Sequence, residues 1–342
     1  MENLLVEPFR QMLDAHCTPE MVRKVEAGAS PAALWQAVEV SGFADALVPE
    51  CEAGAGLQLY DVLPLLLASG AYTLPVPFGP TMLLRACLAT VGVARPEGSI
   101  ALACNVELMP GNGVRCTAVP YGTVADWVVV DLNDQTLLVN ARTAKRVPTG
   151  VHGSLEADIE FDAMDPRNAS FASRPDWLAV GAALFAAQMA GAMRVVLDRT
   201  IGYANERAQF GKTIGQFQAI QQQLGVMAEE VYASHMAAEM AYASPGAIPD
   251  TVLAAVAKSR VSEAAYGVAS IAHAVHGAIG ITEEYDLQLH TRRLHEWRLA
   301  YGSESYWNQH LGTALLDSGQ SALDFMRSDI FLWDCPQTLV PG

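Results

Sequence analysis

The stretch from residue 206 to residue 218, ERAQFGKTIGQFQ, combines residue types that suit a phosphate ligand. Arg207 carries a planar guanidinium, and its forked N–H donors match the oxygens of a phosphate group. Gly211 and Gly215 allow the backbone to turn, and a helical pattern restarts at Phe217. Arg207 could instead pair with an acidic neighbour while the glycines only turn the chain. These residues alone leave both interpretations open.

Three segments with different hydrophobic periods must position this stretch. Residues 1–97 predict an N-terminal helical domain interrupted by loops. Residues 98–165 contain short runs rich in β-branched residues between Gly, Pro, Asn and Asp, and predict a small antiparallel β-barrel or sandwich. Residues 166–342 return to a helical period in long runs, which predict a C-terminal four-helix bundle. We therefore expect a mainly α protein with a small middle β domain.

Local signals support these segments. Ser30 and Pro31 start a helix that should stop at Gly42, and a second apolar helix should end at Gly70. The expected strands are SIALAC, VRCTAV, WVVVDL, TLLVN and LEADIEF. In the C-terminal third, the helices are apolar on more than one face, so they should bury one another.

Composition limits the partners and the compartment. The formal charge of −16 would repel a phosphate backbone or an anionic membrane surface. The six cysteines show no C-x-x-C pair and no metal-ligand spacing, so we predict no metal site and a reduced, cytoplasmic location. The N-terminus lacks a secretory pattern, and we expect neither a membrane span nor nucleic-acid binding.

Three motifs, in the same order along the chain, resemble those of the acyl-CoA dehydrogenase family. The stretch LVPECEAGAGL (47–57) is similar to the family's v-P-E-x-x-G-G-x-G loop. HAVHGAIGITEEYDLQLHTRR (273–293) resembles its Q-x-x-G-G-x-G-x-x-x-E-x-P segment. The joint resembles its R-x-x-F-G-x-x-I-x-x-F-Q signature through Arg207, Phe210, Gly211, Ile214, Phe217 and Gln218. The order helical, β, helical is also the family's, so the resemblance covers essentially the whole chain.

The resemblance implies an FAD-dependent α,β-desaturation of an acyl-CoA thioester. In that chemistry a glutamate removes the α proton and the flavin accepts the β hydride. Electrons then pass to an electron-transferring flavoprotein. FAD should lie between the β domain and the C-terminal bundle, in an oligomer of related subunits.

The resemblance implies that FAD is contacted by residues of the joint, by the loop 274–280 and by one further residue. Arg207, with Phe210, should hold the pyrophosphate, and Gln218 should add a second contact; in the family these residues reach the neighbouring subunit's FAD. The loop Ala274, Val275, His276, Gly277, Ala278 to Gly280 should approach the adenosine and diphosphate end. Ser303 is the remaining candidate. The alternative for the loop is a helix stop at Gly277 without a ligand.

Two parts of the family pattern are missing. The β segment ALACNVELMPGNGVRC has no T-E-P, and no W-I-T or W-I-S follows it, so the usual isoalloxazine contacts are absent. Counted along the C-terminal motif, Tyr301 falls where the catalytic glutamate should be. The second position used by some relatives is Gly181. Tyrosine, with an ordinary pKa near 10, is a poor base at neutral pH. Glu304 is a weak substitute, because a solvated or capping role suits it better.

Three hypotheses follow. The chain could be a self-sufficient homo-oligomeric dehydrogenase with a non-standard base. It could be a non-catalytic helical scaffold. We favour the third: a partner subunit that completes the FAD site of a homologous acyl-CoA dehydrogenase subunit, as in heteromeric family members that degrade bulky substrates such as sterol side chains.

Overall fold

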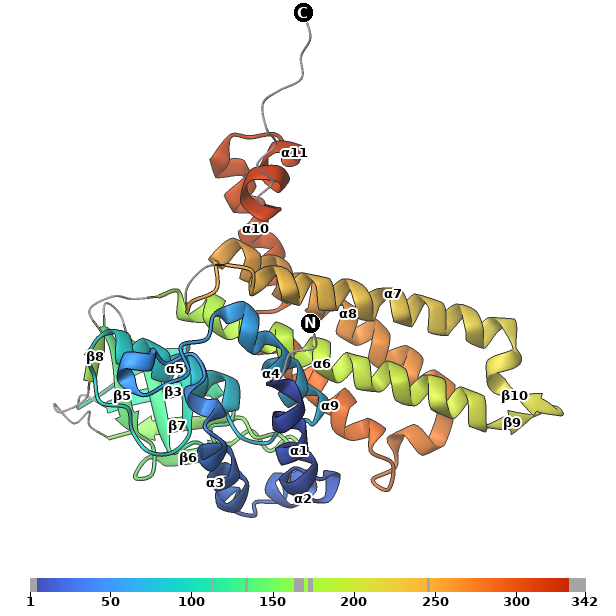
Figure 1. Cartoon of the computed structure of the whole chain (residues 1–342), viewed down its shortest axis with the longest axis horizontal. Helices are drawn as coiled ribbons and strands as arrows, with labels where there is room; N and C mark the ends of the chain where they lie inside the picture. The colour runs from blue at the N-terminus through green and yellow to red at the C-terminus, as the bar shows by residue number, and fades with distance from the viewer. Residues whose placement is uncertain are drawn as a thin grey trace, which may run out of the picture.

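The computed structural model describes residues 5–111, 113–132, 135–162, 169–171, 175–244 and 247–331. Its elements follow the expected order of helices, strands and helices (Figure 1). The five helices of the N-terminal unit are α1 (Val6–His16), α2 (Pro19–Glu26), α3 (Ala32–Ser41), α4 (Leu59–Ala71) and α5 (Phe78–Thr90). As predicted, α3 stops at Gly42, whose left-handed φ of 74° suits a residue without a side chain.

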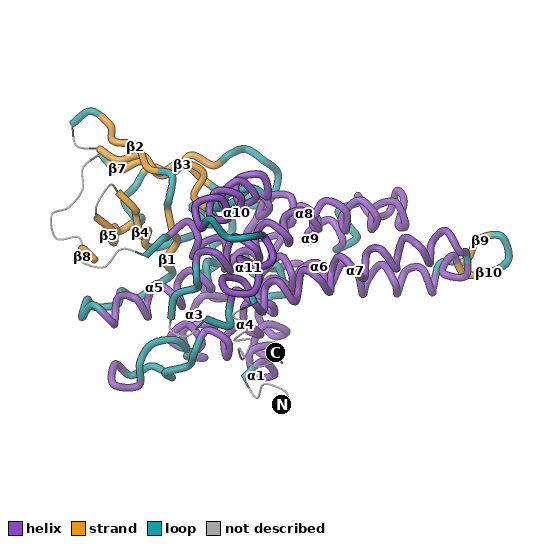
Figure 2. The backbone as a smooth tube through the Cα atoms, turned by 90° about the horizontal axis from the view of Figure 1, so that it is seen from above, coloured by secondary structure: helices purple, strands orange, loops and turns teal. Residues whose placement is uncertain are grey.

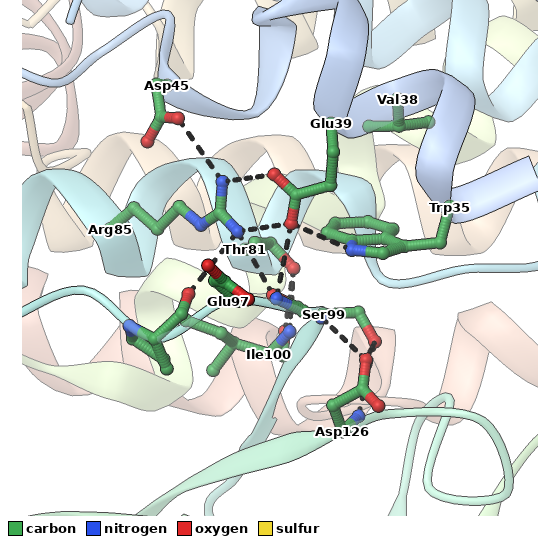
Figure 3. Close-up of polar contacts among 12 residues, drawn as sticks. Trp35, Val38, Glu39, Asp45, Thr81, Arg85, Glu97, Ser99, Ile100 and Asp126 are labelled. Carbon is green, nitrogen blue, oxygen red and sulfur yellow. Dashed lines mark hydrogen bonds and ion pairs between the residues drawn. The ribbon is translucent and has the colours of Figure 1, made fainter. Parts of the chain in front are cut away.

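A buried arginine joins the N-terminal helices to the first strand. Arg85 on α5 pairs through its guanidinium with Glu39 of α3 and, at 3.3 Å, with Asp45 (Figure 3). The same guanidinium donates to the carbonyl oxygens of Pro96 and Gly98, which precede β1 (Ile100–Ala103). Both terminal nitrogens of this buried guanidinium therefore have anionic or carbonyl partners, whereas its Nε has no hydrogen-bond partner among the described residues.

The middle unit is a sandwich of two four-stranded sheets. The strands are β1, β2 (Val106–Met109), β3 (Gly113–Val119), β4 (Trp127–Leu132), β5 (Gln135–Asn140), β6 (Lys145–Pro148), β7 (Ala157–Phe161) and β8 (Ala169–Phe171). Their orders are β1-β4-β5-β8 and β2-β3-β7-β6. The two sheets are separate, so of the two predicted forms the sandwich is correct and the closed barrel is not found. The expected purely antiparallel pairing is also wrong at one place, because β1 pairs with β4 in parallel.

The inward faces of the two sheets form a core of their own. Alternate residues of β1, β3, β4 and β7 pack together, because successive side chains of a strand point to opposite faces. The buried members of this core are Ala101, Ala103, Val114, Cys116, Val119, Ala125, Val128, Val130, Val139, Ala141, Ile159 and Phe161. The five predicted strands are present, and β8 carries the strand pairing to Phe171, a few residues past the expected limit at 165.

Four long helices form the predicted bundle. They are α6 (Trp177–Glu206), α7 (Gln218–Ala241), α8 (Thr251–His276) and α9 (Leu287–Leu299), and they run side by side in both views (Figures 1 and 2). The chain continues through α10 (Glu304–Ser318), which packs on α8, and α11 (Ala322–Phe325).

The helix α4 lies directly on α6 because glycine is present at both contact points. A Cβ atom built on Gly70 would lie 1.8 Å from the carbonyl oxygen of Gln188, and one on Gly191 would lie 1.9 Å from that of Leu67. Any side chain at either position would therefore push the two backbones apart. Residues 179–193 of α6 are all buried between the N-terminal unit and the bundle, whereas its last turns are partly exposed.

Two helical stretches, α6 and Thr251–Ile281, are long and apolar enough to cross a bilayer by length and composition, although the sequence predicted no such run. In α6, 89% of the most apolar window is buried inside the protein, as in the core helix of a bundle, and such helices are weak evidence for a membrane span. Within the described residues, no group of three or more His, Cys, Asp and Glu side chains could hold a metal, and five cysteines are free thiols. Cys335 lies outside the described residues.

Candidate functional site

The joint after α6 is a β-hairpin arm. The helix α6 ends at Glu206, and β9 (Ala208–Gln209) pairs with β10 (Lys212–Thr213) before α7 begins at Gln218. Gly211, which was expected to allow the backbone to turn, forms the hairpin turn with Phe210, and both residues have positive φ. Phe210 is 93% exposed at the tip of the arm. This hairpin was not predicted, because each of its strands has only two residues and shows no alternating pattern.

The predicted FAD loop lies beside the base of this arm. The α8 helix ends at His276, and Gly277–Ile281 continues as one short 3₁₀ turn. The ring of Tyr203, one helical turn before Arg207, stacks on the His276 ring with their centroids 4.4 Å apart. The Tyr203 hydroxyl donates a hydrogen bond to the His276 carbonyl at 3.3 Å. Arg207 and the loop, two groups identified by resemblance, therefore lie together at one end of the bundle.

The residues of this cluster differ in how exposed their side chains are to a ligand. The side chains of Arg207 and Gln218 are exposed, and Ala274, Gly277 and Ala278 present an exposed surface with no bulky side chain. Val275 and His276 are buried, so their predicted contact with FAD could come only from the backbone. The His276 ring is already used: Nδ1 lies 2.7 Å from the Ala272 carbonyl, and Nε2 lies 3.2 Å from the Tyr285 hydroxyl.

These residues fit the phosphate end of FAD. The Arg207 guanidinium makes no ion pair with any residue that the structure describes, so it can donate to a phosphate group without first losing a partner. Small residues at 274, 277 and 278 permit close approach of a ligand to the backbone. Ser303 does not belong to this cluster, because its side chain caps the start of α10 by accepting from the Tyr306 amide.

The two positions at which relatives could carry a base meet at the other end of α6. A Cβ atom built on Gly181 would lie 2.3 Å from Cδ1 of Tyr301, so the tyrosine ring packs directly against the glycine. The Tyr301 hydroxyl donates to the Leu102 carbonyl of β1 at 2.9 Å, and its ring meets Phe185 edge to face. Burial raises the pKa of Tyr301 well above its ordinary value, so this group is a hydrogen-bond donor rather than a base.

The weak candidate Glu304 is committed to an ion pair. Its carboxylate accepts from both Nε and Nη2 of Arg298, with Nε at 3.0 Å. The hydrogen bond from Arg298 lowers the pKa of Glu304, so the carboxylate stays charged and paired. Asp198 likewise pairs with Arg194 on the exposed face of α6. Neither carboxylate is placed as a substitute base.

The Tyr301 end of α6 also borders a cleft between the sandwich and the bundle, called here the interdomain cleft. It has a volume of about 690 Å³ and is lined by β1, β3, the β6–β7 loop, the first turn of α6, α9 and the start of α10. Glu156 and Glu296 line it, and neither residue was predicted from the sequence. No local signal could have found Glu156, because only folding of the β6–β7 loop against α9 brings it to the cleft.

About 45 Å of helix separate the two ends. The first residue of α6, Trp177, donates its indole N–H to Thr136 of β5 at 2.8 Å, so α6 begins on the sandwich. Its 30 residues, at about 1.5 Å each, place the arm about 45 Å away. Figure 1 shows the hairpin and the sheets at opposite ends of the molecule.

Comparison with known proteins identifies the relatives of this chain. Residues 175–315 match the family model "Acyl-CoA dehydrogenase, C-terminal domain". The "Acyl-CoA dehydrogenase IpdE2" of Mycolicibacterium smegmatis is 30% identical over 297 residues, which cover 85% of this chain and 91% of that protein.

Solved structures share the whole fold. The "Tcur3481-Tcur3483 steroid ACAD G363A variant" superposes with a TM-score of 0.79 at 25% identity and covers 93% of this chain and 98% of its own. A chain of the ChsE4-ChsE5 complex from Mycobacterium tuberculosis gives a TM-score of 0.76 at 22% identity over 92% of this chain and 96% of its own. With the three motifs, the element order and these matches, the chain belongs to the acyl-CoA dehydrogenase family.

Proposed function

We propose that this chain acts as a partner subunit in an FAD-dependent acyl-CoA dehydrogenase, where its arm and the 274–280 loop complete the FAD site of a homologous subunit. The observation that carries this proposal is the separation of about 45 Å between the arm and the chain's own sandwich. A flavin bound at the sandwich of this chain could not be reached by Arg207 of the same chain.

In this role, Arg207 and Gln218 would bind the phosphate end of FAD, and the exposed backbone at Gly277 and Ala278 would receive the adjoining part. FAD, when bound, supplies the acceptor for the β hydride of the acyl-CoA. The residues of this chain would bind and orient the cofactor rather than remove the α proton. Tyr301 and Gly181 support this division, because they occupy both base positions with groups that cannot take the proton at neutral pH.

The relatives suggest the substrate class. One solved neighbour is named as a steroid acyl-CoA dehydrogenase with two components. We extend this to a bulky, steroid-derived acyl-CoA as the substrate of the complex and to an electron-transferring flavoprotein as its electron acceptor. A cytoplasmic location remains a prediction from the sequence.

Flavin absorbance tests the proposal. The chain purified alone should be colourless, and the complex formed by co-expression with a homologous subunit should contain FAD and reduce it when acyl-CoA is added. Arg207→Ala should lower the FAD content of the complex, whereas Arg10→Ala, an exposed arginine on α1, should not. A yellow homo-oligomer that reduces its own flavin would support the self-sufficient enzyme instead. A complex that contains no flavin would support the hypothesis of a non-catalytic scaffold.

A further inference from the structure

The interdomain cleft has the size and walls of a small-molecule site. Its volume of about 690 Å³ lies within the range of ligand pockets, about 300–1,000 Å³. Its apolar wall comes from both domains: Leu102, Pro120, Val151, Leu178, Leu299 and Tyr306. A second hollow of about 490 Å³ shares Cys104, Asn105 and Leu178 with it, so the two form one elongated cleft.

The charges of the cleft do not suit an anion. Glu156 and Glu296 line the main hollow, and Asp131 and Asp176 line its extension. Among the described lining residues, Arg292 is the one guanidinium, and each of its nitrogens is already occupied. Nη2 pairs with Glu26, Nη1 donates to the His152 carbonyl, and Nε donates to Gln288.

The histidines do not change this balance. Burial, then the charge of Arg298, lowers the pKa of His295, so its ring is neutral near pH 7. His152 lies 3.6 Å from Glu283 at the exposed rim. A diphosphate or carboxylate entering the cleft would therefore lose its water without meeting a free cation.

Glu156 is a polar group of the main hollow that has no counter-ion among the described residues. Within the described residues, its carboxyl group makes no ion pair, although it is half-buried. Burial, followed by the charges of Glu296 and Asp158, raises its pKa. Glu296 differs, because Nη1 of Arg293 donates to it at 2.8 Å. A half-buried carboxylate facing an apolar wall gains most from a ligand that brings a positive charge or a hydrogen-bond donor.

We infer that the interdomain cleft of this chain is a ligand site for a compact apolar molecule that carries an ammonium group, with Glu156 as the receiving carboxylate. The ammonium group would lie against Glu156, and the apolar body would lie against Leu102, Leu178 and the aromatic ring of Tyr306. A neutral hydroxyl in place of the ammonium would bind more weakly, and an anionic group would be excluded. This site needs neither FAD nor the partner subunit, so it goes beyond the proposed function.

Three probes with one apolar body test the inference: 1-adamantanamine, 1-adamantanol and 1-adamantanecarboxylate. In calorimetric titration of the full chain at pH 7, the amine should bind at least about tenfold more tightly than the carboxylate, with the alcohol between them, because a charge-assisted hydrogen bond is stronger than a neutral one. Equal binding of all three, or binding of none, would overturn the inference.

Two variants and a control locate the site. Glu156→Gln should weaken binding of the amine about tenfold and leave the alcohol unchanged, because the amide keeps an acceptor but loses the charge. Leu178→Trp should abolish binding of all probes by filling the part shared by the two hollows, with melting temperature confirming that the variant is folded. Glu107→Gln, an exposed carboxylate on β2, should change nothing. An unchanged affinity for the amine in Glu156→Gln, or in folded Leu178→Trp, would contradict this site. The flavin assay of the proposed function is independent of each of these results.

Discussion

The contact between Gly181 and Tyr301 can be tested by adding one methyl group. In a helix interior, Gly→Ala ordinarily stabilises by up to about 1 kcal/mol, because alanine has the higher helix propensity. At Gly181, however, the new Cβ would lie 2.3 Å, 2.4 Å and 2.7 Å from three atoms of the Tyr301 ring. The ring cannot move away freely, because its hydroxyl is bonded to the Leu102 carbonyl and its edge packs on Phe185.

We therefore expect Gly181→Ala to lower the free energy of unfolding by about 1–3 kcal/mol, the range for an overpacked core. Gly202→Ala is the matched control, because it lies on the same helix and a Cβ atom added there would have no neighbouring atom within 4 Å. This control should be neutral or stabilising by up to about 1 kcal/mol. Urea denaturation of both variants, followed by circular dichroism, measures the difference.

A substitution of Tyr301 distinguishes the clash with its ring from the effect of alanine on the helix itself. Tyr301→Ala removes the Cγ, Cδ1 and Cε1 atoms that the new Cβ would meet, so Gly181→Ala should no longer destabilise in that background. The coupling between the two substitutions should then be about 1–3 kcal/mol, a usual size for residues in contact. The reasoning is refuted if Gly181→Ala is as stable as Gly202→Ala, or if its effect is the same in the Tyr301→Ala background.

Two further predictions concern buried charges. Burial lowers the pKa of Lys258 to about 7, from 10.5 in the unfolded chain, so the unfolded state binds more protons between about pH 7 and 10.5. Across that window, the free energy of unfolding should rise by up to about 1.4 kcal/mol per pH unit relative to that of Lys258→Met, as measured by urea denaturation of both proteins. If the difference between the two proteins does not change with pH, Lys258 stays charged against the Trp297 and Arg298 carbonyls. Arg85→Met should lower the free energy of unfolding by about 3 kcal/mol, because it leaves the partly buried Glu39 carboxylate without its cation. Adding Glu39→Gln should recover part of that stability in thermal unfolding. No recovery would show that the unpaired charge is not the cause of the loss.

The fold could be predicted to the level at which hydrophobic period decides it. The change from helical to strand period and back gave the three units, and β-branched runs gave the five strands with clear patterns. The strand β6 was missed because its sequence, KRVP, is mostly exposed and ends in proline, as in an edge strand. The parallel pairing of β1 with β4 was missed because β1 and β4 are not consecutive, and periodicity does not specify which strands become neighbours.

The parts of the candidate site that lie in sequence motifs could be predicted, because the spacing of residues within each motif identifies them. Arg207 and Gly277 lie in motifs, and the contact between Tyr203 and His276 brings those motifs to one end of the bundle. The packing of Tyr301 against Gly181 joins distant parts of the chain, so the sequence identified both positions without indicating that they touch. Glu156 has no signature at all, because its environment is created by a loop of the sandwich lying over α9.

The length of α6 connects these observations. A rigid helix of about 45 Å fixes the arm far from the sandwich, so one chain cannot use both ends on the same cofactor. At the arm, an arginine that makes no ion pair with any described residue and several small residues are exposed, so a ligand or partner can reach them. At the sandwich, the tyrosine ring is buried, its hydroxyl is satisfied and the glycine opposite accommodates it, so a carboxylate side chain at position 181 would also require a smaller residue at position 301. The chain therefore has a tyrosine and a glycine at the two expected base positions at one end and an exposed arginine at the other, and the proposed partner subunit would account for both.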